Sequence, residues 1–154
     1  MLLTSKPRYK WWGYVKNVIR DYPALEKEYR ELHEQKVTAS ITGMPGGGNV
    51  SRGTEDIAIR DLPRSKQLEY DAVRRAIEVT GMLKTGAERL KIVELVFFKQ
   101  SHTLDGAAYH QHISYDTAID YHGDFIMLVA YFRELITYDE LPQKIALKSQ
   151  KNVL

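Results

Sequence analysis

One stretch constrains the fold of this chain more than any other: residues 125–132 are eight consecutive apolar residues, Phe-Ile-Met-Leu-Val-Ala-Tyr-Phe. As a helix this stretch has no polar face, so neighbouring elements must cover it on all sides. The cover comes either from the N-terminal helices or from a second subunit, and the modest length of the chain, 154 residues, favours a homo-oligomer. A membrane span needs about 20 apolar residues, so we expect no contact with a membrane.

Apolar residues recur at helical spacing through most of the chain, and no stretch alternates for long enough to require a strand. We therefore predict an all-α fold. The first helix is expected over residues 9–37. Pro23 lies inside it and should kink or split it, because proline lacks an amide hydrogen and clashes with the preceding turn.

Residues 38–53 interrupt the helical periodicity and include the stretch Met-Pro-Gly-Gly-Gly-Asn. No lysine follows these glycines and no strand precedes them, which disfavours a phosphate-binding loop. A flexible linker is the expected structure. The chain is thus divided into an N-terminal helical arm (residues 1–37), a linker (38–53) and a helical domain (54–154).

Helix start signals recur within the predicted helical domain. Thr54 precedes an acidic first turn, and Ser65 follows a proline at the start of a helix that should end near Gly81. Thr85 with Glu88 three residues later has the pattern of a capping box, at the start of a helix expected to run to residue 98.

Residues 103–136 have the pattern of a helix-turn-helix. A short helix from Thr103 has small residues, Ala107 and Ala108, where a second helix would cross it. Residues 111–113 form the turn, in which Ile113 fills the corner, and Ser114 caps a long final helix. An ordinary helical hairpin is the alternative explanation of the same spacing.

Several motifs, in chain order, resemble the RinA/ArpU-like group of phage late-gene transcriptional activators, whose C-terminal helix-turn-helix is similar to region 4 of sigma-70 factors. They are an aromatic-rich helix leading into Asp-Tyr-Pro, a glycine-rich linker before Thr-Glu-Asp-Ile-Ala-Ile, a helix ending in Phe-Phe-Lys, and His-Ile-Ser with a following threonine. The resemblance implies a DNA-binding regulator of phage or prophage late genes, with double-stranded DNA as partner and RNA polymerase as a further possible contact.

The residues expected to contact DNA fall into two sets. The start of the last helix should face the major groove, since this is how a recognition helix reads bases, and basic or imidazole side chains around it should contact phosphate. The groove-facing set is Ser114, Tyr115, Thr117 and His122, and the phosphate set is Lys99, His102, His110 and His112.

The last helix departs from the usual pattern in one respect, because Asp116, Asp120 and Asp124 repeat along it where Arg, Lys, Asn or Gln are common. Carboxylates next to phosphates are repulsive. We interpret the three as a solvated helix face. The alternative function is therefore an oligomeric assembly or packaging adaptor, similar to a small terminase, that reuses the helix-turn-helix as a protein-binding fold.

Charge is unevenly distributed at the other end of the chain. The first twenty residues contain five lysines and arginines and no acid, although the net charge of the chain is only +2. Such an arm either contacts phosphate or is a solvated helix face.

Enzyme chemistry is not indicated. The absence of cysteine excludes disulfides and cysteine-based zinc sites, and no catalytic triad is apparent. The spacing of His110, His112 and His122 is unlike a metal-ligand pattern. We expect no catalytic residue, metal or cofactor. Because no signal peptide is recognisable either, a location in the cytoplasm of the bacterial host is expected.

Overall fold

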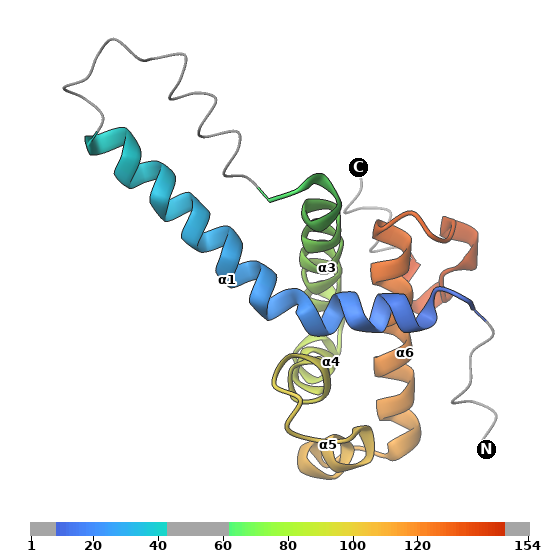
Figure 1. The fold of residues 1–154 in the computed structure, drawn as a ribbon. Helices are drawn as coiled ribbons and strands as arrows, with labels where there is room; N and C mark the ends of the chain where they lie inside the picture. Colours follow the sequence, from blue (N-terminus) through green and yellow to red (C-terminus); the bar gives the residue numbers. More distant parts are fainter. Residues whose placement is uncertain (1–8, 43–61, 147–154) are drawn as a thin grey trace.

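The computed structural model describes residues 9–42 and 62–146, with the side chains of 35–42 excepted. Every regular element in these ranges is a helix, so the all-α prediction is confirmed. Figure 1 shows a long helix, α1, crossing α6 and α3, with α4 and α5 below the crossing. None of the helices in the described ranges is long and apolar enough to span a membrane.

Helix α1 is one element, Trp12–Thr42, with Pro23 inside it. The helix is bent rather than split, and Figure 1 shows the change of direction along its length. Ile19 on one side of the proline and Leu25 on the other are both buried in the same core. This packing keeps the helix continuous across the proline, despite the missing backbone hydrogen bond.

The first helix extends further than expected, because residues 38–42 continue α1 instead of starting the linker. The rest of the predicted linker, residues 43–53, lies outside the described residues. So does the helix start expected at Thr54.

Helix α3 spans Arg64–Met82 and begins directly after Pro63, as the sequence predicts to within one residue. Its buried face includes Val73, Ala76 and Val79 at helical spacing. These residues pack against α1 and α6 in one large cluster, the main core.

The next predicted helix is divided into α4, Gly86–Val93, and a short π-helical segment η3, Glu94–Phe98. The predicted capping box at its start is wrong. Thr85 accepts a hydrogen bond from the Arg89 Nε (2.9 Å), and Glu88 accepts one from the Tyr121 hydroxyl (2.6 Å). Both side chains are therefore occupied by contacts with other side chains and leave the helix start without a side-chain cap.

Within the described residues, α5, Leu104–Gln111, and α6, Tyr115–Phe132, follow, and then the short 3-10 helix η4, Tyr138–Glu140, and helical residues 143–146. Helix α5 matches the expected short helix from Thr103 to within one residue at its start, and α6 begins after Ser114 as expected but ends at Phe132, before residue 136. After η4 the chain returns to the main core, where Leu141 and Ile145 are buried.

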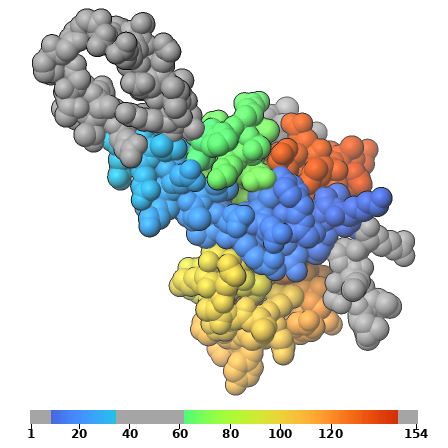
Figure 2. Space-filling view, viewed as in Figure 1, coloured from blue at the N-terminus to red at the C-terminus, as the bar shows by residue number. Residues whose placement is uncertain are grey.

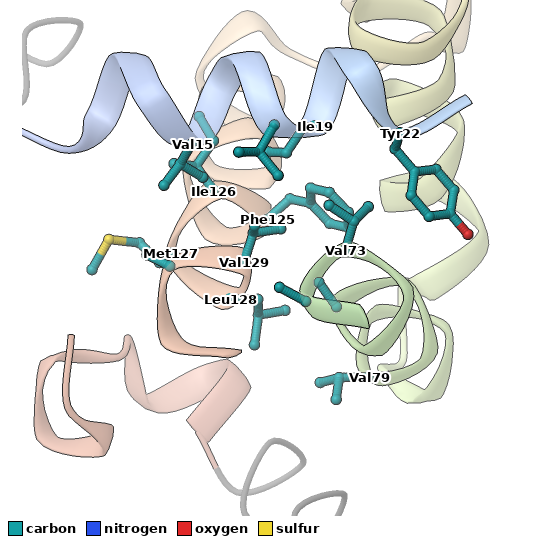
Figure 3. Packing of buried hydrophobic residues seen from close by; sticks show 14 of the residues in the cluster. Val15, Ile19, Tyr22, Val73, Val79, Phe125, Ile126, Met127, Leu128 and Val129 are labelled. Atoms are coloured by element: carbon teal, nitrogen blue, oxygen red, sulfur yellow. The ribbon is translucent and has the colours of Figure 1, made fainter. Parts of the chain in front are cut away.

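The apolar stretch 125–132 is covered within one chain. Residues 125–130 are at most 8% exposed, and Tyr131 and Phe132 are half-buried. Figure 3 shows Ile126 beside Val15 of α1, and Phe125 between Ile19 of α1 and Val73 of α3. Because helices of the same chain supply this cover, the stretch does not require the second subunit that its composition favours.

Candidate nucleic-acid interface

Two side-chain caps define the ends of the α5–turn–α6 unit. The Thr103 Oγ1 accepts a hydrogen bond from the Gly106 amide at 3.0 Å, and the Ser114 Oγ accepts one from the Thr117 amide at 3.0 Å. Each satisfies an amide that the first turn of a helix leaves without a partner. Local sequence therefore fixes where both helices begin.

The turn between the helices depends on one residue in the left-handed region. His112 has φ 60° and ψ 41°, a conformation that costs energy for a residue with a Cβ. Directly after it, the Ile113 amide donates to the Ala108 carbonyl at 3.0 Å, which closes α5. The turn therefore leads from the end of α5 to the cap of α6 through two residues, His112 and Ile113.

A second, smaller cluster of buried side chains lies behind the unit, and we call it the small core. The positions where α5 and α6 meet are alanines, Ala107, Ala108 and Ala118, each at most 2% exposed. Short side chains allow the two helices to approach closely, as the sequence predicts. The remaining buried members are Ile92, Leu95 and Tyr121.

Three of the predicted groove-facing residues lie together at the start of α6. Tyr115 is 47% exposed and projects from the first turn. Ser114 is exposed and Thr117 is half-buried, and the Ser114 hydroxyl donates to the Thr117 Oγ1 at 2.8 Å. Both hydroxyls therefore serve the helix start first, and Tyr115 is the side chain of this set with most freedom to reach a ligand.

The structure places His122, the fourth predicted groove-facing residue, in a partly buried position facing η3. Its ring stacks on Phe97, with the ring centroids 5.0 Å apart. Burial, and then the positive charges of Lys16 and Arg20, lower the pKa of His122 to about 4. The side chain is neutral and packed at neutral pH, so it does not belong to the surface formed by Tyr115.

The predicted phosphate-contacting residues are spread around α5. His102 and His110 are brought together, with ring centroids 5.1 Å apart, and His112 is exposed at the turn. Lys99 is also exposed, but its Nζ lies 3.4 Å from a Glu94 oxygen. Part of its charge is thus already compensated.

The three aspartates of α6 have different environments. Asp124 is 6% exposed, so its interpretation as part of a solvated face is wrong. Its Oδ2 accepts a hydrogen bond from the Arg89 Nη1 at 2.9 Å and lies 3.2 Å from the Lys144 Nζ. Asp120 is exposed and 3.8 Å from the same lysine. Asp116 has no ion pair within the described ranges.

Sequence reasoning missed the cations that compensate these aspartates. Arg89 lies three and four residues before the buried Ile92 and Val93, on the apolar face of α4, which is the signal that could have indicated its burial. Its guanidinium also lies 4.6 Å from the centre of the Tyr121 ring. Lys144 carries no such signal, because its partners lie on α6, distant in sequence.

In the described part of the chain, no group of three or more histidines, aspartates or glutamates is placed so that it could hold a metal ion. The exposed side chains of α5 and α6 are half aromatic or imidazole groups and half carboxylates: Tyr109, His110 and Tyr115, and Asp105, Asp116 and Asp120. The aromatic and imidazole groups bind by hydrogen bonding and stacking.

Comparison with known proteins gives one informative similarity. No protein-family profile matches the chain, and no solved structure matches it significantly. The chain is 33% identical over 78 residues to a protein of Streptococcus phage O1205 named "Putative autolysin regulatory protein ArpU". The matched region is 50% of this chain and 54% of the phage protein, so the similarity spans about half of each. This chain is therefore similar, over about half its length, to a phage regulatory protein.

Proposed function

We propose that this chain is a DNA-binding regulatory protein of phage type, in which the first two turns of α6 enter the major groove of duplex DNA. The observation that carries the proposal is the position of Tyr115, which is exposed at the start of α6 directly outside the small core. The short side chains of that core hold α5 and α6 close together, and a recognition helix needs such support.

The surroundings of Tyr115 fit a nucleic-acid surface. The start of α6 presents backbone amides and the positive end of the helix dipole, which attract phosphate. His102, His110 and His112 add imidazole donors on and around α5. The Tyr115 hydroxyl is then available to a base edge.

Negative charge on α6 is smaller than its sequence suggests. Asp124 is compensated by Arg89 and Lys144, and Lys144 also lies near Asp120. Asp116 therefore remains as the main carboxylate that phosphate would meet on the first turns of α6. One such group weakens nonspecific binding without preventing entry into a groove, and it can accept a hydrogen bond from a cytosine amino group.

The similarity to a phage protein named as a regulator supports a regulatory role. The sequence resemblance further suggests that the regulator activates late genes and that it does so by contacting RNA polymerase. The earlier alternative, an assembly or packaging adaptor, predicts a ring-sized oligomer with little sequence preference.

Fluorescence anisotropy with short duplexes tests the proposal. We expect tight binding to the late-promoter region of the phage and weaker binding to a shuffled duplex, with affinity falling steeply between 50 and 200 mM salt, through roughly six phosphate contacts or more. Tyr115→Ala should reduce affinity for the preferred duplex roughly tenfold. Leu135→Ala is the matched control, because Leu135 is also exposed (38%) but lies beyond the opposite end of α6.

Two results would contradict DNA binding by α6. One is weak binding that does not change with salt or sequence, together with a ring-sized mass in light scattering, which would support the adaptor. The other is tight, sequence-dependent binding that Tyr115→Ala and Leu135→Ala leave equally intact.

A further inference from the structure

Two of the positively charged side chains on helix α1, Lys16 and Arg20, lie in an unfavourable arrangement. Lys16 and Arg20 are one helical turn apart, where like charges repel. Neither forms an ion pair with an acid in the described ranges, and Arg20 instead donates a hydrogen bond to the Asn17 side chain at 3.1 Å. Burial of its stem, and then the charge of Arg20, lower the pKa of Lys16.

Some other cationic side chains on α1 and α3 have an acid beside them, whereas Lys27, Arg64 and Lys66 form no ion pair in the described ranges. Arg30 has Glu26 one turn away at 3.8 Å, and Arg74 lies 2.9 Å from Glu78. Against this background, Lys16 and Arg20 form a cationic pair that folding does not compensate. Such a pair fits an anionic partner outside the chain.

The cationic pair lies beside the proposed DNA-reading helix. The positive charges of Lys16 and Arg20 act on His122 of α6. One residue further along, a Cβ on Gly123 would be 3.9 Å from the ring of Trp12, at the start of α1. Gly123 lies about two helical turns beyond Tyr115 on α6. Figure 2 shows the N-terminal half of α1, in blue, next to the yellow residues near 100 that lead into α5, on one face of the molecule.

We infer that Lys16 and Arg20 contact the phosphate backbone of a duplex whose major groove receives the start of α6. The inference rests on the proposed function and adds a second contact region to it. Arginine can hold a phosphate through two parallel hydrogen bonds, and lysine neutralises it as a point charge. Because both lie on a helix packed against α6, the two contact regions are held in a fixed relation.

The test compares salt dependence in the full chain. Each lost phosphate contact should reduce the slope of log affinity against log salt by about 0.9, so Lys16→Gln with Arg20→Gln should reduce it by about 2 and weaken binding roughly 50-fold at 0.1 M salt. The control is Arg64→Gln with Lys66→Gln. It removes the same charge from exposed residues at the start of α3, which Figure 1 places away from α5.

A charge-preserving exchange separates phosphate contact from a structural role. Lys16→Arg with Arg20→Lys should retain the wild-type slope, and the double glutamine variant should keep the wild-type melting temperature because it removes a repulsion. If the wild type binds DNA and the glutamine variant has an unchanged slope, this inference is overturned and the proposed function stands. A slope reduced equally by the charge-preserving exchange would also overturn it. If the wild type itself shows no salt-dependent binding, the proposed function fails.

Discussion

Acidification from pH 7 to pH 5 should destabilise the folded chain mainly through one side chain, His122. Its ring is packed on Phe97, and its pKa is about 4 in the folded chain against an ordinary value of 6.5. Between these two values the unfolded chain binds more protons than the folded chain, so the free energy of unfolding falls as the pH falls. Linkage gives a loss of about 2 kcal/mol at pH 5, rising to about 3 kcal/mol below pH 4.

Urea unfolding at pH 7 and pH 5, followed by circular dichroism, measures this loss. In His122→Phe the aromatic ring is kept and the titrating group is removed, so we expect the loss between the two pH values to shrink by about 2 kcal/mol. Carboxylates that titrate in the same range are common to both proteins, and their contribution cancels in the comparison. His110→Phe is the matched control, because it makes the same exchange at an exposed ring on α5.

The reasoning is refuted if wild type and His122→Phe lose the same free energy of unfolding between pH 7 and pH 5. That result would mean that the His122 ring accepts a proton in the folded chain as readily as in the unfolded one. It would then have to be solvated or paired with an acid, contrary to its position beside Phe97, Lys16 and Arg20.

Two further predictions concern the interior. Asp124→Asn should lower the free energy of unfolding by about 3 kcal/mol, because it leaves the buried Arg89 guanidinium without its carboxylate; a loss below about 1 kcal/mol in urea unfolding would show that this ion pair is dispensable. Gly86→Ala should cost more than about 2 kcal/mol, since its Cβ would lie 2.5 Å from the Thr80 carbonyl oxygen. Gly13→Ala has open space and should instead be neutral or stabilising by up to about 1 kcal/mol; similar melting temperatures for the two variants would contradict this difference.

The α5–turn–α6 unit is the part of the fold that sequence predicts best. Thr103 and Ser114 cap helices through amides three residues away, so their signals are local and survive in any tertiary context. The same holds for Ala107, Ala108 and Ala118. Their small side chains indicate a close helix contact even when the residues that they touch are not known. The starts of both helices and the small residues at their contact could therefore be predicted, whereas the other members of the small core, Ile92, Leu95 and Tyr121, were not.

Side chains whose environment depends on distant partners were predicted least well. Asp124 has the spacing of an exposed stripe, but its burial is decided by Arg89, 35 residues earlier in the chain. His122 likewise looks accessible on a short helical pattern, and it is α1 and η3 that enclose it. Pro23 is a strong local signal for a break, which the packing of α1 residues on both sides of it overrides.

Helix α6 links the two cores of the molecule. Its residues 125–130 belong to the main core, whereas Ala118 and Tyr121 belong to the small core. Because one continuous helix joins them, the α5–turn–α6 unit cannot rotate independently of α1 and α3. In the proposed complex, base contacts from the start of α6 and phosphate contacts from α1 would therefore be made by a preorganised surface. Little conformational entropy is then lost when DNA binds, and each set of contacts strengthens the other.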